Sequence, residues 1–334
     1  MSIRKAAILL CRFSDLPALD LRPADWYRQY FSESGAGTGG AWDYWRDITF
    51  GEVDLTGSQV FGWFNMTRSR ADAQALVYPG GRSTLAQWGI DTALANGVNL
   101  AAFSIVCVVF NSATDHGSAG GNRVVFGFAN STAWEPTFIF HEMGHALGLP
   151  HSWSAGMPDV EYGNAWDIMS AMNVHRFVGN YPDRSGPGLN AAYIRKLGAL
   201  PASRVHVPAK LLYRRKVVIN LAALSAPEAP GSLVIEIPPG YTGTAQTSGY
   251  LIEFRRRQRW DKGIPNDAVL VHEVRANGLS YLLTPQLTSG GALTMTIAGI
   301  PVTLQSIDPA SDTATVALVL PGKPLPFAEK AKKW

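Results

Sequence analysis

Three of the chain's seven histidines fall within eleven residues, and their spacing limits what this part of the chain can fold into. Residues 141 to 151 read His-Glu-Met-Gly-His-Ala-Leu-Gly-Leu-Pro-His. On a helix, His141 and His145 differ by about 40° around the axis and about 6 Å along it, so both imidazoles leave the same face. A continuous helix would carry His151 about 15 Å along the axis from His141. The pattern therefore predicts a helix that ends before His151.

Two residues in this motif favour such an ending. Gly148 is the residue type that adopts a left-handed conformation at a helix C-terminus, and Pro150 cannot continue a helix. The chain can then turn back and bring His151 to the other two histidines. Three imidazole nitrogens at roughly 2.0 to 2.1 Å suit a zinc ion. We expect His141, His145 and His151 to hold one Zn²⁺.

Glu142 follows the first expected ligand and points about 100° away from it, beside the metal rather than onto it. Three neutral imidazoles would leave zinc its full charge and an open fourth position, where the pKa of a bound water falls toward 7. Glu142 would accept a proton from that water and later protonate the departing amine. The motif therefore predicts a zinc-dependent endopeptidase with Glu142 as the general base.

The motif has two other interpretations. An ordinary core helix with satisfied histidines explains it poorly, because packing alone does not gather three of seven histidines into eleven residues. A relative that binds zinc but is inactive stays open, although the presence of Glu142 argues against it.

The length of 334 residues favours two domains. The pattern of apolar and turn residues changes near residue 203. Before that point, apolar runs alternate with helical patterns, which indicates a mixed α/β layer structure. The expected strands are 6–13, 53–64, 103–110 and 123–129, and the expected helices lie near 42–49 and 83–95. After Pro201, short apolar runs separated by turn residues indicate a β-sandwich of about seven strands. These runs are 217–219, 233–237, 250–254, 269–274, 293–297, 302–307 and 314–320.

We therefore expect an α/β domain over residues 1–203 and an all-β sandwich-like domain over residues 204–334. The second domain would end in a solvated tail from Pro321. No sheet is expected to combine strands from both sides of the boundary, and the two parts would fold separately or dock through a modest interface.

Composition excludes several classes of protein. Apolar residues make up 46% and charged residues 16%, which is typical of a folded chain. The net charge of +3 comes from scattered Lys and Arg, so a nucleic-acid partner is not predicted. The short basic runs 214–216 and 255–257 are interpreted as solvated strand faces. The longest nearly apolar stretch, residues 100–110, is about half of what a membrane span requires.

The cysteines and the N-terminus give two further expectations. Cys11 and Cys107 lie in apolar runs, which favours buried free thiols, and two cysteines exclude a disulfide framework. Residues 6–13 follow Arg4 and Lys5 as in a secretory signal, but Arg12 comes too soon and no small-residue cleavage site appears. We interpret them as the first buried strand, with no signal peptide visible.

Residues 141–151 resemble the metzincin signature, and residues 167–170, Asp-Ile-Met-Ser, resemble the Met-turn of that clan. The resemblance implies that Met169 lies beneath the zinc as a packing floor and not as a ligand. Segments 44–62, 166–170 and 249–272 resemble gametolysin-like and immune-inhibitor-like secreted metallopeptidases. This implies a metzincin catalytic domain, with a twisted mixed sheet and an active-site helix, followed by a β-rich domain in a secreted, extracellular enzyme.

Two departures from the family pattern concern Cys11 and Ala171. Cys11 lies in an apolar strand, where it is a poor candidate for a zinc-blocking cysteine. Ala171 stands two residues after the Met of the Met-turn, where astacin-like enzymes carry a Tyr.

Other polar residues carry weaker signals. His175 and Tyr181 follow the Met-turn and would line the cleft, but a surface or packing role is favoured for both. Asp115 and His116 lie in a Gly-rich loop, where an ordinary turn is favoured over a structural Ca²⁺ site, for which the pattern gives no support. His272 lies midway along an alternating strand and is expected to be structural.

For an endopeptidase, a protein or peptide substrate is expected to add a strand to the edge formed by about residues 124–129. The segment 171–187 would wall the pocket just beyond the cut. Two other functions stay open. In the first, the β-rich half is an adhesion module that binds carbohydrate or protein, and the zinc site beside it is inactive. In the second, the metal site hydrolyses small-molecule amides or esters in a closed pocket.

Overall fold

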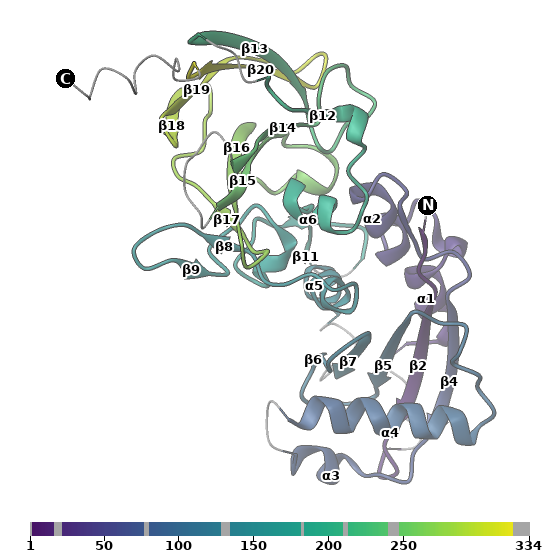
Figure 1. The fold of residues 1–334 in the computed structure, drawn as a ribbon. Helices are drawn as coiled ribbons and strands as arrows, with labels where there is room; N and C mark the ends of the chain where they lie inside the picture. The colour runs from purple at the N-terminus through teal and green to yellow at the C-terminus, as the bar shows by residue number, and fades with distance from the viewer. Residues whose placement is uncertain are drawn as a thin grey trace.

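The structure is a computed structural model that describes residues 2–16, 22–76, 80–127, 134–181, 184–209, 213–239 and 247–322. It has a mixed α/β architecture with several sheets and few helices. One sheet has five strands, and it lies at one end of an elongated molecule with the β-rich half at the other (Figure 1). Helix α5 (Pro136–Ala146) lies between them.

The apolar runs of the first half form a five-stranded sheet in the order β4-β2-β5-β7-β6. The first four strands in this order run parallel, and β6 is antiparallel to β7. Side chains alternate between two cores, so that Leu9 packs in one and Leu10 in the other. The strands are β2 (Ala6–Arg12), β4 (Gln59–Asn65), β5 (Ile105–Phe110), β6 (Gly117–Ser118) and β7 (Arg123–Gly127).

Helices cover both faces of this sheet. Helix α4 packs along one face, where Leu85, Ala86 and Ala93 join the core that contains Leu9. Helix α5 contacts β6 and β7 from the other core, together with α2. The remaining elements of this half are α1 (Ala24–Phe31), α2 (Ala41–Ile48), α3 (Arg70–Gln74), α4 (Gly81–Ala95), α6 (Ala191–Lys196), β1 (Ser2–Ile3), β3 (Val53–Asp54), β10 (Phe177–Val178) and β11 (Arg184–Ser185).

The expected substrate edge is wrong at Val124 and Val125, where another strand of this chain occupies it. Val124 and Val125 on β7 pair with Ser118 and Gly117 on β6, so β6 is the outer strand there. The Gly-rich loop after β5 folds back along β7 and takes the place expected for a substrate. Residues 128 and 129 of the expected strand lie outside the described residues.

The second half contains the expected β-strands in two sheets. A four-stranded antiparallel sheet has the order β13-β20-β19-β18, and its buried residues share a core with β14, β15 and β16. The strands are β12 (Val205–His206), β13 (Arg215–Ala222), β14 (Val234–Ile237), β15 (Thr247–Arg255), β16 (Ala268–Arg275), β17 (Ser280–Leu282), β18 (Thr294–Ile297), β19 (Ile300–Asp308) and β20 (Thr313–Leu320). Residues 323–334 of the expected tail lie outside the described residues.

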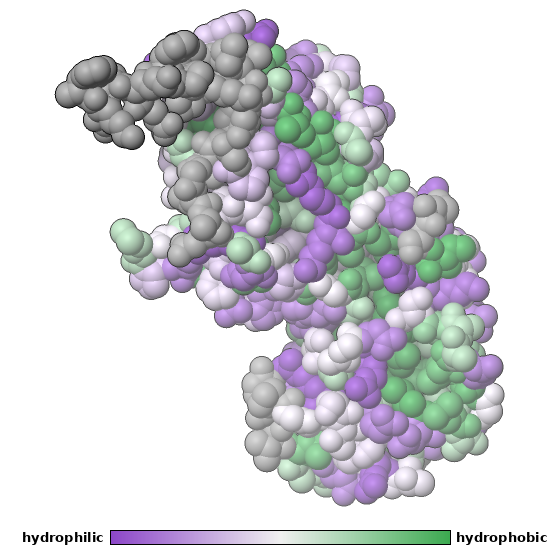
Figure 2. All heavy atoms as spheres, viewed as in Figure 1, coloured by the Kyte–Doolittle hydropathy of each residue, from purple (hydrophilic) through white to green (hydrophobic). Residues whose placement is uncertain are grey.

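The expectation that no sheet combines strands of both halves is wrong. The seven-stranded sheet has the order β12-β14-β15-β16-β17-β8-β9, and its last two strands come from the first half. Strand β8 (Trp153–Ser154) runs parallel to β17, and β9 (Val160–Glu161) completes a hairpin with β8. In Figure 1 this hairpin projects from the body of the molecule, and its tip is pale green in the space-filling view of Figure 2.

The core is also continuous across residue 203. One cluster of buried apolar residues includes Leu10 and Phe140 from the first half and Ile252 and Val316 from the second. The two halves are therefore joined by a shared sheet and a shared core.

Burial tests the remaining expectations from composition. Cys11 and Cys107 are buried free thiols, as predicted. Arg255 is only 1% exposed, so its assignment to a solvated strand face is wrong. Its neighbours Arg256 and Arg257 are more exposed because successive strand residues point to opposite sides and β15 ends there. Among the described residues, no helix is long and apolar enough to cross a membrane.

Candidate metal centre

Helix α5 begins with Pro136 at its first turn and ends as the sequence predicts. Gly148 has φ +87°, the left-handed conformation that glycine adopts without strain. The Leu149 N–H donates to the carbonyl oxygen of Gly144 at 2.9 Å, and the Gly148 N–H donates to that of His145 at 2.9 Å. This pair of bonds closes the helix in a Schellman motif and reverses the chain toward His151.

The three histidines converge. The Nε2 atom of His145 lies 3.1 Å from Nε2 of His141 and 3.1 Å from Nε2 of His151. Ligand atoms of all three lie within 4.8 Å of one another. Nitrogens around a tetrahedral zinc at roughly 2.0 to 2.1 Å lie roughly 3.3 Å apart, so the observed spacing fits a shared ion.

The outer nitrogen of each imidazole contacts an oxygen. Nδ1 of His141 lies 2.9 Å from the carbonyl oxygen of Ile168, and Nδ1 of His145 lies 2.8 Å from that of Leu149. Nδ1 of His151 lies 2.6 Å from a carboxylate oxygen of Glu161. The oxygens of Leu149 and Glu161 accept hydrogen bonds, which favours the proton on Nδ1 of His145 and His151 and makes their Nε2 atoms acceptors. Nδ1 of His141 lies near both the Ile168 oxygen and the Ala171 N–H, which is 3.1 Å away. Converging lone pairs repel unless a cation lies between them, so the donor set fits a metal ion.

Electrostatics keep two of these imidazoles neutral. Burial lowers the pKa of His141 to about 3, and His145 beside it lowers the pKa further. The pKa of His145 is also lowered, chiefly by burial. A neutral imidazole is the form that binds a metal, so both residues are ready ligands at neutral pH.

Glu142 lies beside the histidines and is held by the edge strand β6. Its Oε2 accepts the N–H of Ser118 at 2.6 Å, and the side chain is 6% exposed. Burial raises the pKa of the carboxyl to about 7, against the opposing effects of the Ser118 N–H and Arg82. A carboxyl that titrates near neutrality suits a group that both accepts and returns a proton.

The Met-turn packs under the helix. Met169 is fully buried, and a Cβ on Gly144 would lie 2.4 Å from its Sδ. Asp167 holds the turn, because its Oδ1 accepts the Met169 N–H at 2.7 Å and its Oδ2 accepts the Asn190 N–H at 2.5 Å. Met169 therefore packs against helix α5 at Gly144, where the absence of a side chain permits the close approach.

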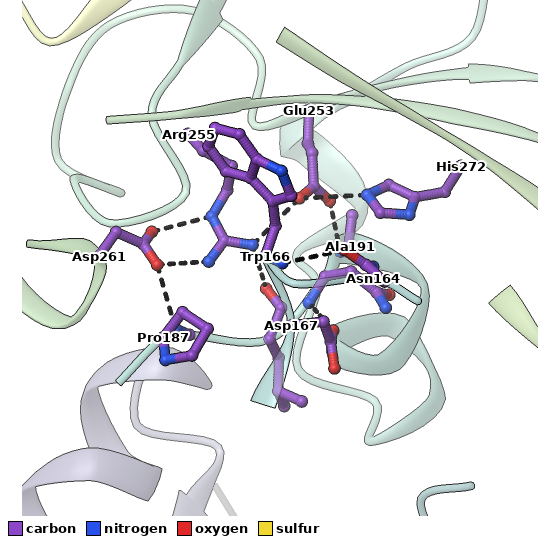
Figure 3. Close-up of polar contacts among 12 residues, drawn as sticks. Asn164, Trp166, Asp167, Pro187, Ala191, Glu253, Arg255, Asp261 and His272 are labelled. Atoms are coloured by element: carbon purple, nitrogen blue, oxygen red, sulfur yellow. Dashed lines mark hydrogen bonds and ion pairs between the residues drawn. The ribbon is translucent and has the colours of Figure 1, made fainter. Parts of the chain in front are cut away.

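A buried ionic cluster from the β-rich half lies behind this turn (Figure 3). Arg255 Nε donates to Asp261 at 2.8 Å, and Arg255 also lies 3.3 Å from Glu253. Glu253 in turn accepts the N–H of Ala191 at 2.6 Å, one residue after the Asn190 that contacts Asp167. The seven-stranded sheet thus supports the Met-turn through charged residues that are shielded from solvent.

The residues with weaker signals lie elsewhere. The Tyr181 hydroxyl contacts Thr38 at 2.8 Å, and its ring packs on Tyr30. His175 packs its ring edge-on to Trp166. His272 is buried 3.4 Å from Glu253, in the cluster just described.

The loop after β5 is held by the side chain of Asp115. Asp115 Oδ1 accepts from Arg82 at 3.0 Å and from the His116 N–H at 2.9 Å. The expected wall segment 171–187 reaches α5, since the Thr137 hydroxyl donates to the carbonyl oxygens of Arg184 and Gly186, while residues 182 and 183 lie outside the described part.

Sequence reasoning missed three groups at this site: Ser118, Glu161 and Tyr162. The Tyr162 hydroxyl lies 3.0 Å from Nε2 of His151. Glu161 and Tyr162 lie ten and eleven residues after His151, and this spacing matches no helix or strand period because a turn separates them from it. The only signal in the sequence for these two contacts is the presence of an acidic residue and a tyrosine shortly after the third histidine.

Comparison of the chain with protein-family models, curated protein sequences and solved structures finds no match. The geometry of the three histidines and Glu142 is therefore the main indication of function.

Proposed function

We propose that this chain is a zinc-dependent endopeptidase of the metzincin kind, with His141, His145 and His151 as ligands and Glu142 as general base. The observation that carries the proposal is the convergence of three Nε2 atoms, with adjacent pairs 3.1 Å apart and each outer nitrogen against an oxygen. The five-stranded mixed sheet, the helix that ends at a left-handed glycine and the buried Met-turn favour the metzincin resemblance.

Zinc bound there would lower the pKa of a water ligand and polarise a substrate carbonyl. Glu142 accepts the proton of the attacking water and delivers it to the amine that leaves. The Ser118 N–H fixes one carboxylate oxygen at 2.6 Å, which leaves the other oxygen for the proton. The Ile168 and Leu149 carbonyls and the Glu161 carboxylate orient the three imidazoles.

The test is Glu142→Gln, which keeps the size of the side chain but removes its ability to accept a proton. We expect zinc content to stay at one per chain and cleavage of an unfolded, labelled protein to fall by about 10² to 10⁴. Glu228→Gln is the matched control, since Glu228 is an exposed carboxylate of the β-rich half. The Glu228→Gln variant should cleave the substrate at the wild-type rate.

Metal dependence is tested separately. His145→Ala should lose most of its zinc by elemental analysis, and a chelator should abolish cleavage by the wild type. Equal cleavage by Glu142→Gln and wild type at equal zinc occupancy would refute the assignment of the base. Full zinc occupancy with no cleavage by the wild type would favour the inactive zinc site.

A further inference from the structure

A cleft of about 570 Å³ is lined by residues of both halves of the molecule, and none of the three histidines lines it. The first half contributes helix α2, the residues just after it, and Gly188 and Leu189. The β-rich half contributes the turn at residues 224–227 and the short 3-10 helix Arg259–Asp261. Ligand-binding clefts measure roughly 300 to 1,000 Å³ and occur preferentially at such junctions. We call this space the junction cleft.

The walls of the junction cleft are mostly apolar. Their large apolar side chains come from both halves and include Ile48, Phe50, Leu189, Leu224, Pro227 and Trp260. The Trp260 ring is held in place, because its Nε1 donates to Oδ2 of Asp47 on α2 at 2.9 Å. An apolar molecule placed between these walls would leave water, which is the main favourable contribution to binding in such sites.

One buried polar group also lines the junction cleft, the guanidinium of Arg255, which is only 1% exposed. A guanidinium has five N–H donors. Nε and Nη2 each donate to a carboxylate oxygen of Asp261 (Figure 3). Nη1 donates to the carbonyl oxygen of Leu189 and to Glu253, both at 3.3 Å. The second N–H of Nη2 therefore has no acceptor within the described part of the chain.

Gly188 leaves space beside this nitrogen. A Cβ at Gly188 would lie 3.3 Å from Nη2 of Arg255 and 3.6 Å from Oδ1 of Asp261. Because glycine has no side chain, this space is open to the junction cleft, which Gly188 also lines. A buried N–H without an acceptor costs free energy, so a ligand oxygen that accepts it is favoured there.

Charge determines which kind of oxygen fits. Arg255 already faces two buried carboxylates, those of Asp261 and Glu253. A carboxylate on the ligand would meet a cluster that is negative overall and would also lose its hydration. A neutral carbonyl oxygen accepts the same N–H without this repulsion. A peptide is disfavoured, because its further amide groups would find few partners along the apolar walls.

We propose that the junction cleft binds an uncharged apolar small molecule whose single carbonyl oxygen accepts the free N–H of Arg255. The proposal goes beyond the peptidase activity and does not depend on it. The cleft nevertheless adjoins the Met-turn, because the Gly188 carbonyl oxygen accepts the Ile168 N–H at 3.2 Å. The Ile168 carbonyl oxygen in turn lies 2.9 Å from Nδ1 of His141. A bound molecule would therefore contact the backbone segment that supports the first histidine.

The test is calorimetric titration of the full chain with octan-2-one, an uncharged ketone with an apolar chain. Gly188→Ala places a methyl group beside Nη2 of Arg255 and keeps every charge of the cluster. Gly179→Ala is the matched control, because its Cβ would lie equally close, 3.3 Å, to the side chain of Ser185, and Gly179 does not line the junction cleft. We expect one site in the wild type, binding at least about fivefold weaker in Gly188→Ala, and wild-type binding in Gly179→Ala.

Two further measurements complete the test. Octanoate, with a chain of the same length, should bind the wild type at least about tenfold more weakly than octan-2-one does. Ser225→Trp, which fills the cleft from a turn of the β-rich half, should abolish binding and decides the matter if Gly188→Ala does not fold. No binding of octan-2-one by the wild type, or wild-type binding by the filled variants, would overturn the site. Tighter binding of octanoate would overturn the uncharged ligand class. Peptide cleavage is scored separately through Glu142→Gln, so a failure of each proposal is distinguishable.

Discussion

Gly144→Ala tests whether the Met-turn packs against the metal-binding helix as described. The added Cβ would lie 2.4 Å from Met169 Sδ and 3.5 Å from the ring of Trp45. Carbon and sulfur normally approach no closer than roughly 3.5 Å, so Met169 must move by about 1 Å. Because Met169 is fully buried, it has no free space into which to move.

The expected magnitude is a difference of two terms. Overpacking a filled core costs about 1 to 3 kcal/mol. Replacing glycine by alanine inside a helix contributes about 1 kcal/mol in the opposite direction. We therefore expect Gly144→Ala to lower the free energy of unfolding by about 0 to 2 kcal/mol, a range too wide to be decisive alone.

A double-mutant cycle with Met169→Ala separates the two terms. Met169→Ala removes the sulfur and by itself costs about 2 to 5 kcal/mol through the cavity it leaves. In that background Gly144→Ala has only its helix-forming effect and should stabilise by up to about 1 kcal/mol. The coupling energy between the two substitutions should therefore equal the overpacking term, about 1 to 3 kcal/mol.

The assay is urea unfolding of the metal-free proteins. Each protein is then loaded with zinc, and its zinc content is measured. Gly148→Ala is the control, because its φ of +87° makes a Cβ strained while no atom lies within 4 Å of it. Its cost should be the same with and without the Met169 side chain, within about 0.5 kcal/mol. A coupling below about 0.5 kcal/mol for Gly144→Ala would refute the packing of Met169 beneath the helix.

Three further outcomes follow from burial and pairing. Arg255→Leu removes the guanidinium that pairs with the buried carboxylates of Asp261 and Glu253, and it should lower the unfolding free energy by about 3 to 5 kcal/mol in denaturant titrations. Replacing the exposed neighbour, as Arg257→Leu, should change that free energy by less than about 0.5 kcal/mol. Burial raises the pKa of Cys11 and of Cys107 from 9.0 to about 12, so native alkylation should stay slow as pH rises through 9 and reach half of its maximal rate only near pH 12. In urea both thiols should react with half-maximal rate near pH 9, and fast native alkylation at pH 8 would contradict their burial. A fragment of residues 1–203 loses the partner of β8 and should melt without a cooperative transition by circular dichroism, whereas melting at the full-length temperature would show that the halves are independent.

The core elements were predictable because they depend on local pattern. The buried run over residues 6–13 and the runs of the second half became strands, since each alternates or is bounded by turn residues. The convergence of His141, His145 and His151 was predictable for a similar reason. Helical spacing and one left-handed glycine fix their geometry within eleven residues, without reference to distant parts of the chain.

The missed features depend on partners far away in the sequence. Strands β8 and β9 have two residues each, and β8 is stabilised by pairing with β17 more than a hundred residues later. Arg255 looked like part of a basic run because its partner Asp261 follows six residues later, after the strand has ended. The phenol of Tyr162 reaches the site only because its backbone is left-handed.

These distant contacts bear on the role of the β-rich half. A binding module that merely accompanied a zinc peptidase would have its own core and a solvated contact surface. Here the shared sheet, the ionic cluster at Glu253 and the segment that carries Tyr162 all lie next to the three-histidine cluster or the turn at Met169. Burying charges costs free energy that apolar packing would avoid, so such a cluster is best explained by the geometry that it imposes. We therefore infer that the β-rich half holds the Met-turn and the third histidine in place, and that substitutions in it alter metal binding before they alter any surface interaction.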